Sequence, residues 1–173
     1  YLFLYSCLIY LLVPLILLRL MKRSVKEEGY RRFISERFGF FRSKCRGEIV
    51  WIHSVSAGET IAAAPLVRRL LDAGYPCLVT NMTPSGRDRV RVLHGDRVEN
   101  CYAPYDTPGA VRRFLDNNHP LALVTIDTEL WPNIIAGCAR RGIPTALING
   151  RMAKRSARRY ALFPLTAPML RSM

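Results

Sequence analysis

The fold is decided by residues 48–59, which read EIVWIHSVSAGE. After Glu48 the first half is a short run of β-branched and aromatic residues, which is typical of a strand buried on both faces. The second half leads into residues 60–74, TIAAAPLVRRLLDAG, whose apolar spacing predicts a helix that stops at Gly74. A buried strand followed by a helix is the repeating unit of parallel sheets.

The same alternation continues along the rest of the chain. We expect further strands at 77–82, 97–103, 121–127 and 143–149, a turn at 83–86 followed by a short helix to about 94, and helices at 108–118, 129–142 and 154–171. This order predicts an α/β fold with a doubly wound parallel sheet, over a domain that runs from 49 to 173. With the common strand order 3-2-1-4-5, strand order reverses between the first and fourth strands, and ligands bind at that point in such sheets.

The first 18 residues, YLFLYSCLIYLLVPLILL, carry no charge, and four cations follow between Arg19 and Lys26. A bilayer core takes about 20 apolar residues, so we expect a membrane-spanning anchor at 1–21. The basic flank places the rest of the chain on the cytoplasmic side. A signal peptide is the alternative, which the lack of a small-residue cleavage site disfavours.

Residues 22–48 form a basic and aromatic juxtamembrane segment, with a short helix expected at 27–37. Five aromatic residues lie among its arginines: Tyr30, Phe33, Phe38, Phe40 and Phe41. They fit a membrane surface and the outer wall of the core equally well.

Composition limits the class of protein. The 173 residues carry 26 Lys and Arg against 13 Asp and Glu, so the formal charge is +13, and half of the residues are apolar. A charge of this sign favours an anionic partner: nucleic acid, an acidic membrane or a phosphorylated substrate. The five cysteines form no C-x-x-C pair, and no P-loop or G-x-G-x-x-G motif is present. We therefore expect no metal site, no disulfide framework and no nucleotide-cofactor motif.

Glu59 ends the motif that follows the first strand, and it has two interpretations. Ser56-Ala57-Gly58-Glu59 has the S-x-x-E pattern of a capping box, in which Glu folds back on the start of its own helix. The alternative is a general base, since a helix N-terminus favours a nearby negative charge. In that case Gly58 lets a substrate approach the backbone closely.

Other polar residues follow the remaining strands. Asp127 and Glu129 lie at the end of the fourth strand, where alternation turns one of them toward the cleft; caps or arginine partners are the plainer roles. Residues 83–87, TPSGR, open a helix that either binds an anion or is simply capped. We expect His53 to be packed, His94 and His119 to lie at the surface, and the basic run from Arg151 to Arg159 to be solvated or to meet phosphate.

Taken together, these features resemble the N-terminal half of the bacterial 3-deoxy-D-manno-octulosonic acid (Kdo) transferases. The resemblance rests on the apolar N-terminus and on six motifs in order: ERFG at 36–39, HSVSAGE at 53–59, MTPSG at 82–86, PYD at 104–106, TELWPN at 128–133 and NGR at 149–151. The family has Glu where this chain has Asp127, and N-A-R where it has Asn149-Gly150-Arg151.

The resemblance implies a GT-B fold in which this chain is the Rossmann-like, acceptor-side half. It implies an inverting transfer of Kdo from CMP-Kdo to a phosphorylated lipid A precursor, at the cytoplasmic face of the bacterial inner membrane, with no cofactor and no nucleic acid. Glu59 is then the base and Asp127 a second catalytic carboxylate. The substrate-binding residues are then Ser54, Ser56, Gly58, Thr83, Ser85, Gly86, Glu129 and Arg151. CMP-Kdo would be bound mainly by a second domain.

Two alternatives to this function stay open. One is a different membrane-bound sugar transferase of the same architecture. The other is a non-catalytic basic domain that binds acidic lipid or nucleic acid, although no nucleic-acid-binding module is evident in the sequence.

Overall fold

A computed structural model of the chain describes residues 1–150 and 166–171. Its centre is a five-stranded sheet in the order β3-β2-β1-β4-β5, in which every neighbouring pair is parallel. The strands are β1 Val50–His53, β2 Cys77–Asn81, β3 Glu99–Tyr102, β4 Ala122–Ile126 and β5 Thr145–Ile148. The predicted parallel sheet and its strand order are confirmed.

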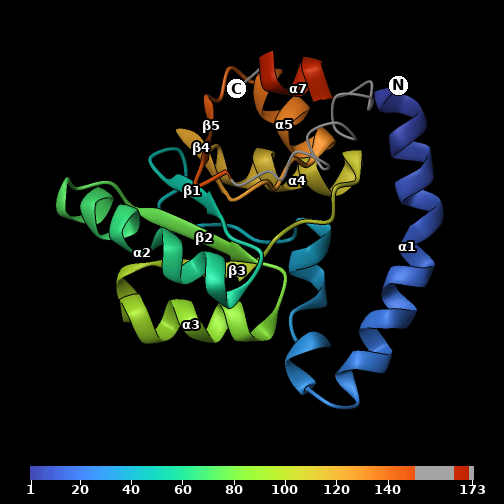
Figure 1. Cartoon of the computed structure of the whole chain (residues 1–173), viewed down its shortest axis with the longest axis horizontal. Coiled ribbons are helices and arrows are strands. Elements are labelled where there is room, and N and C mark those ends of the chain that lie inside the picture. Colours follow the sequence, from blue (N-terminus) through green and yellow to red (C-terminus); the bar gives the residue numbers. More distant parts are fainter. Residues whose placement is uncertain (151–165, 172–173) are drawn as a thin grey trace.

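Helices cover both faces of the sheet (Figure 1). One face carries α2 (Ala57–Asp72) and α3 (Pro84–His94), and the other carries α4 (Pro108–Asn118) and α5 (Pro132–Ala139). A 3-10 helix, η3 (Gly95–Arg97), follows α3, and α7 (Thr166–Arg171) lies against α5. Residues 154–165 of the helix expected at 154–171 lie outside the described residues.

Side chains of β1 alternate between the two hydrophobic layers. Trp51 packs with Phe114 of α4, with ring centroids 4.6 Å apart, whereas Ile52 packs with Val67 of α2. The indole N–H of Trp51 donates to Thr80 Oγ1 at 2.8 Å, so its polar atom is satisfied inside the core. Successive side chains of β1 thus enter opposite hydrophobic layers, so this uncharged central strand is buried on both faces.

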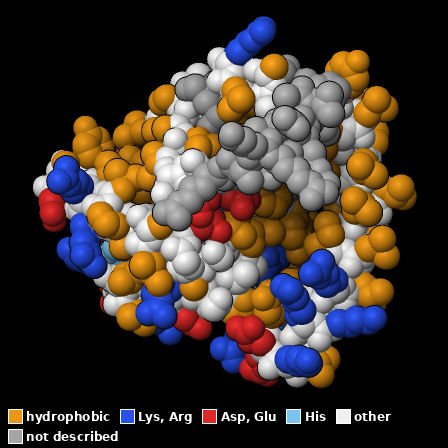
Figure 2. Space-filling model, viewed as in Figure 1, with side chains coloured by type: hydrophobic (Ala, Val, Ile, Leu, Met, Phe, Trp, Pro, Cys, Tyr) orange, Lys and Arg blue, Asp and Glu red, His pale blue; other side chains and the backbone are white. Residues whose placement is uncertain are grey.

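The N-terminal helix α1 (Leu2–Ser24) runs beside the domain (Figure 1). It is long and apolar enough to cross a membrane by length and composition, and Pro14 lies inside it without ending it. Its outward side is apolar: Phe3, Leu4, Leu8, Leu11, Leu15 and Leu18 are exposed. Figure 2 shows hydrophobic side chains along the α1 edge of the molecule, with Lys and Arg side chains gathered at its lower end. The last turn of α1 carries Lys22 and Arg23.

The inward side of α1 is held by polar contacts with the domain. Tyr5 Oη donates to Asp106 Oδ2 at 2.9 Å, and Ser6 Oγ donates to Asn133 Oδ1 at 3.0 Å. Farther along, Tyr10 Oη accepts from the Gly109 N–H at 3.0 Å. Tyr5, Ser6 and Tyr10 of the uncharged run therefore contact the domain.

Between α1 and β1 the chain forms no α-helix, so the expected helix at 27–37 is wrong. Two 3-10 helices, η1 (Glu28–Tyr30) and η2 (Ile34–Phe38), are found instead, and Phe33 between them has a positive φ of 55°. The reason is that Glu36 and Arg37 turn into the domain and are buried. The aromatic residues divide, since Phe33 and Phe40 are exposed whereas Phe41 packs against the core.

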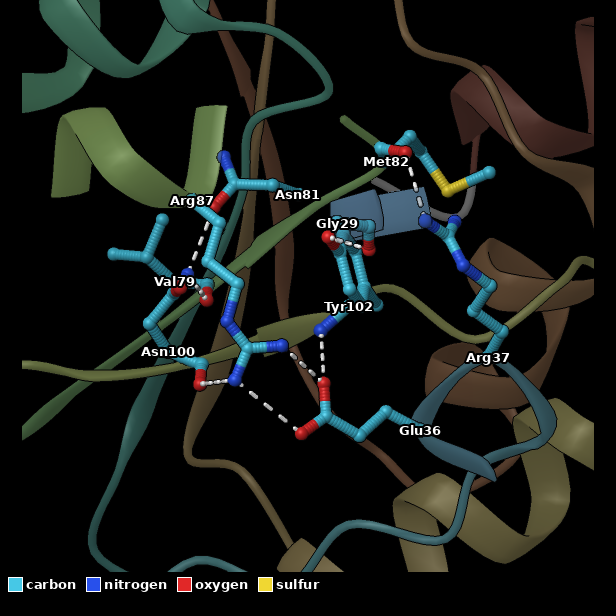
Figure 3. Close-up of polar contacts among 9 residues, drawn as sticks. All are labelled: Gly29, Glu36, Arg37, Val79, Asn81, Met82, Arg87, Asn100 and Tyr102. Carbon is cyan, nitrogen blue, oxygen red and sulfur yellow. Dashed lines mark hydrogen bonds and ion pairs between the residues drawn. The ribbon is translucent and has the colours of Figure 1, made fainter. Parts of the chain in front are cut away.

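Glu36 joins this segment to the sheet (Figure 3). Its carboxylate accepts from the Tyr102 N–H at 2.8 Å and pairs with Arg87 of α3 at 2.7 Å. Arg37 stacks 3.9 Å from the Tyr102 ring centroid and donates to the Met82 carbonyl at 3.2 Å. Residues 34–38 are thus fixed to the carboxyl ends of β2 and β3.

His94, expected at the surface, is buried at the end of α3, so that expectation is wrong. Burial, together with the charges of Arg68 and Arg97, lowers the pKa of its imidazole. His119 is exposed and His53 is buried, as expected.

Replacing Glu36 by Ala should lower the free energy of unfolding by about 3 kcal/mol, because Arg87 loses the partner of a largely buried ion pair. Urea denaturation measures the change. Glu28→Ala is the matched control, since Glu28 pairs with Arg31 and Arg32 at the surface and its removal should change stability little. Equal effects of the two substitutions would contradict the assigned role of Glu36.

Candidate active site

The candidate site lies at the carboxyl ends of β1 and β4. These strands are neighbours in space but are separated in sequence by β2 and β3, so strand order reverses between them. Residues 54–59 follow β1, and residues 127–131 follow β4. The sheet therefore brings the two acidic loops of the sequence to one edge, as the strand order predicted. On this side of the molecule, Figure 2 shows acidic side chains gathered near the middle of the face, beside hydrophobic ones.

Glu59 lies in the first turn of α2, where Ser56 is the N-cap. Its Oε2 accepts from the Val55 N–H at 2.7 Å, and its Oε1 accepts from Ser56 Oγ at 2.9 Å. Ser56 Oγ also accepts from the Glu59 N–H at 3.5 Å, so Ser56 caps the helix and the Glu59 side chain folds back on the helix start, as the capping interpretation expected. A carboxylate offers about four lone-pair sites, so these two hydrogen bonds fix its orientation and leave it able to accept a further proton donor.

Glu129 is close enough to Glu59 and Asp127 to be affected by their charges. Burial raises the pKa of the Glu129 carboxyl, and the negative charges of Glu59 and Asp127 raise this pKa further. The hydrogen bond from Trp131 Nε1, at 2.7 Å, acts in the opposite direction and lowers the pKa. Three carboxylates thus share one edge of the sheet, which favours a bound proton or a nearby cationic or hydroxyl group.

Asp127 does not continue the strand. β4 ends at Ile126, and Asp127 has a φ of 58°, so both Asp127 and Glu129 lie beyond the strand and the alternation on which their expected separation rested does not apply to them. Asn149, which also has a positive φ, donates from Nδ2 to Asp127 Oδ1 at 2.7 Å. This contact joins the loops that follow β4 and β5.

His53, the last residue of β1, is buried beneath the site and contacts Trp131. Its ring lies edge-on to Trp131, with centroids 5.8 Å apart, and its Nδ1 is 3.0 Å from Thr80 Oγ1. Burial lowers the pKa of His53 to about 4, so the ring is neutral at physiological pH. A neutral, packed histidine holds the Trp131 side chain beside Glu129.

The residues predicted to bind substrate near β1 have different environments. Ser54 is fully buried, and its hydroxyl contacts Thr60 Oγ1 and Asn81 Nδ2, which places it beneath the site. Ser56 caps α2. Gly58 is exposed, and among the described residues a Cβ added there would meet only Ser56 Oγ, at 3.9 Å. Within that part of the chain, open space therefore lies over the start of α2.

The residues predicted at the start of α3 are mostly structural. Thr83 is the N-cap, accepting from the Gly86 N–H at 3.2 Å. A Cβ on Gly86 would lie 2.9 Å from Asn81 Nδ2, so glycine is required there for packing. Ser85 is exposed. Arg151, the last predicted substrate-binding residue, lies outside the described residues.

Asp106, which ends the PYD motif at 104–106, lies in this region, and no role was predicted for it from the sequence. It is buried, and its carboxylate accepts from the backbone N–H groups of Asn133 and Ile134, at 3.1 and 2.8 Å, as well as from Tyr5. It therefore binds the N-terminus of α5, directly after the Glu129 loop. Its position between β3 and α4, at the same edge of the sheet, is the sequence feature that could have indicated its role.

Within residues 1–150 and 166–171, no group of three or more His, Cys, Asp or Glu side chains is arranged to hold a metal ion. The expectation of metal-independent chemistry stays a prediction.

Comparison with known proteins gives the family of the chain. A parallel five-stranded sheet with helices on both faces is consistent with one half of a GT-B glycosyltransferase. Residues 32–173 match the family described as 3-deoxy-D-manno-octulosonic-acid transferase (kdotransferase). The chain belongs to this family.

Curated relatives agree with this assignment. The chain is 40% identical to the 3-deoxy-D-manno-octulosonic acid transferase of Haemophilus influenzae and 37% identical to that of Bordetella pertussis, over 91% and 85% of its length. It is 34% identical, over 96% of its length, to a probable mitochondrial 3-deoxy-D-manno-octulosonic acid transferase of Arabidopsis thaliana. The matches cover 38%, 36% and 38% of these relatives, so the chain corresponds to their N-terminal part.

Asp106 makes stability depend on pH. Burial raises the pKa of its carboxyl from 3.8 to about 7, against the lowering effect of its hydrogen bonds to Asn133, Tyr5 and Ile134. The folded state therefore binds a proton that the unfolded state releases, and the stability from this group is lost as pH rises from about 4 to about 7. We expect Asp106→Asn to flatten the fall in melting temperature between pH 5 and 8. Asp116→Asn, at an exposed carboxylate, should keep the wild-type slope; identical slopes for all three proteins would contradict the assignment.

Proposed function

We propose that this chain is the acceptor-side half of an enzyme that transfers Kdo from CMP-Kdo to a phosphorylated lipid A precursor. The observation that carries the proposal is the position of Glu59. Its carboxylate is held in a fixed orientation at the β1–β4 edge of the sheet, beside Glu129, in a chain that belongs to the kdotransferase family. A second domain supplies most of the CMP-Kdo site.

In this proposal Glu59 is the general base. It takes the proton of the acceptor hydroxyl as that oxygen forms a bond to the anomeric carbon of Kdo. The bond from this carbon to the CMP phosphate breaks at the same time, and CMP leaves with the electron pair. Two hydrogen bonds, from Val55 and Ser56, fix the carboxylate before substrate arrives, which lowers the entropic cost of the step.

The surrounding residues fit supporting roles. The open space above Gly58 gives the acceptor sugar access to the start of α2. Asp127 is the second catalytic carboxylate; together with Glu129 it orients the acceptor hydroxyls, and Thr83, Ser85 and Arg151 remain proposed contacts to the acceptor. Ser54 and Gly86 act indirectly, by holding the loops that carry these groups.

The anchor in this proposal is α1, which attaches the enzyme to the cytoplasmic face of the bacterial inner membrane. Its exposed apolar side and the basic residues of its last turn support this role, since cations near an apolar helix end favour an anionic lipid surface. The phosphorylated acceptor is itself a membrane lipid, so attachment brings the site to its substrate.

In the complete enzyme, Glu59→Gln should reduce the turnover of Kdo transfer by at least ~100-fold at nearly unchanged melting temperature. Glutamine can still accept from the Val55 N–H but cannot take up a proton. Glu48→Gln, at an exposed glutamate just before β1, is the matched control and should leave turnover unchanged. A purely capping role predicts the reverse, namely about 1 kcal/mol of lost stability with turnover intact. Near-normal turnover of Glu59→Gln would therefore overturn the proposed mechanism.

Deleting residues 1–20 should release most of the complete enzyme from the membrane pellet, because the exposed apolar side of α1 is removed. Some binding should persist at low salt, through the remaining cations. Tyr5→Phe is the control: it breaks the contact with Asp106 but keeps the apolar surface, so it should pellet normally. An intact enzyme that stays in the supernatant after lysis would contradict the anchoring role.

A further inference from the structure

We propose that a basic pocket between α1, α4 and α5 binds the phosphate of an anionic phospholipid from the membrane to which the chain is attached. This inference rests on the membrane attachment proposed above and adds a specific lipid site to it. The pocket has a volume of about 400 Å³ and is lined by Tyr10, Pro108, Gly109, Arg112, Arg140 and Arg141. It is separate from the carboxylate edge at Glu59.

The charge of the pocket is largely uncompensated. Arg141 pairs with Asp116 at 2.6 Å, but Arg112 and Arg140 are exposed and form no ion pair within the described part of the chain. None of the described residues that line the pocket is a carboxylate. Guanidinium groups bind phosphate oxygens in pairs of parallel hydrogen bonds, so two free arginines on one pocket match a phosphate diester.

The start of α4 shapes the pocket but does not supply free donors. The N–H of Gly109 is bonded to Tyr10 Oη, and the N–H of Ala110 is bonded to Thr107 Oγ1. The arginine side chains are therefore the groups that recognise the anion, while the Tyr10 contact holds α1 at the rim of the pocket.

A lipid headgroup fits this position better than a free anion. Tyr10 belongs to α1, and Phe3 and Pro14, which lie on nearly the same side of the helix as Tyr10, are exposed and apolar. A phospholipid whose phosphate meets Arg112 and Arg140 can lay its acyl chains along this side of the helix. Inorganic phosphate would gain only the polar half of these contacts.

The test uses the complete, detergent-solubilised protein and soluble short-chain lipids. Dihexanoyl phosphatidylglycerol, dihexanoyl phosphatidylcholine and inorganic phosphate are titrated separately, and affinity is measured by calorimetry. Arg112→Gln combined with Arg140→Gln is the pocket variant. Arg68→Gln combined with Arg69→Gln is the matched control, because it removes the same charge from exposed positions on α2, across the sheet.

A cation near an anionic lipid surface contributes about fivefold in affinity. We therefore expect the pocket variant to bind phosphatidylglycerol about tenfold or more weakly, and the control to stay within twofold of wild type. Equal losses in both variants would overturn the site, because net charge would then explain binding. Equal affinity for phosphatidylcholine, or inorganic phosphate that binds as tightly as phosphatidylglycerol, would overturn the assignment to an anionic lipid. Release of the enzyme on deleting residues 1–20 is measured independently, so failure of the pocket and failure of the anchor are distinguishable.

Discussion

The carboxylate of Asp106 is the interaction on which the arrangement of the helix α1 and the site loop depends. It accepts hydrogen bonds from Tyr5 of α1 and from two backbone N–H groups at the start of α5, and Asn133 returns a bond to the Asp106 carbonyl at 2.6 Å. Because α5 begins at Pro132, fixing its first turn also fixes Trp131 and, through it, Glu129. A buried carboxylate with several donors is costly to desolvate but holds its partners in one geometry. The helix α1 and an acidic residue of the candidate site are thereby connected through one side chain.

Capping and catalysis are compatible at Glu59. A capping contact normally explains a glutamate at this helix position, and the structure contains that contact. The same contact orients the carboxylate at the edge where β1 meets β4, beside open space above Gly58. A base needs a fixed geometry before the substrate binds, and a cap provides it without additional residues. What separates the two roles is therefore the size of the effect on turnover relative to stability.

The sheet, its strand order and the meeting of the two acidic loops could be predicted because they follow from local signals. Uncharged β-branched runs mark buried strands, and parallel strands place their following loops on one edge. The segment at 28–45 could not be predicted in this way. Glu36 and Arg37 read as surface charges in a basic stretch, but their partners, Arg87 and Tyr102, lie about 50 or more residues away in sequence. Burying such charges costs desolvation free energy, which only contacts with residues distant in sequence offset here. Composition alone therefore assigns these residues to the surface.

The N-terminal helix shows why hydropathy alone does not define how an apolar helix meets a membrane. Its less exposed positions recur at helical spacing, including Leu2, Tyr5, Ser6, Ile9 and Leu20, and the polar ones among them bond to the domain. Crossing the bilayer would require these hydrogen bonds to break and would leave Asp106 without Tyr5. In the docked position the outward side of α1 is free, so it is the side that the proposed attachment would place against lipid. In that proposal the anchor and the pocket of Arg112 and Arg140 act on the same membrane surface.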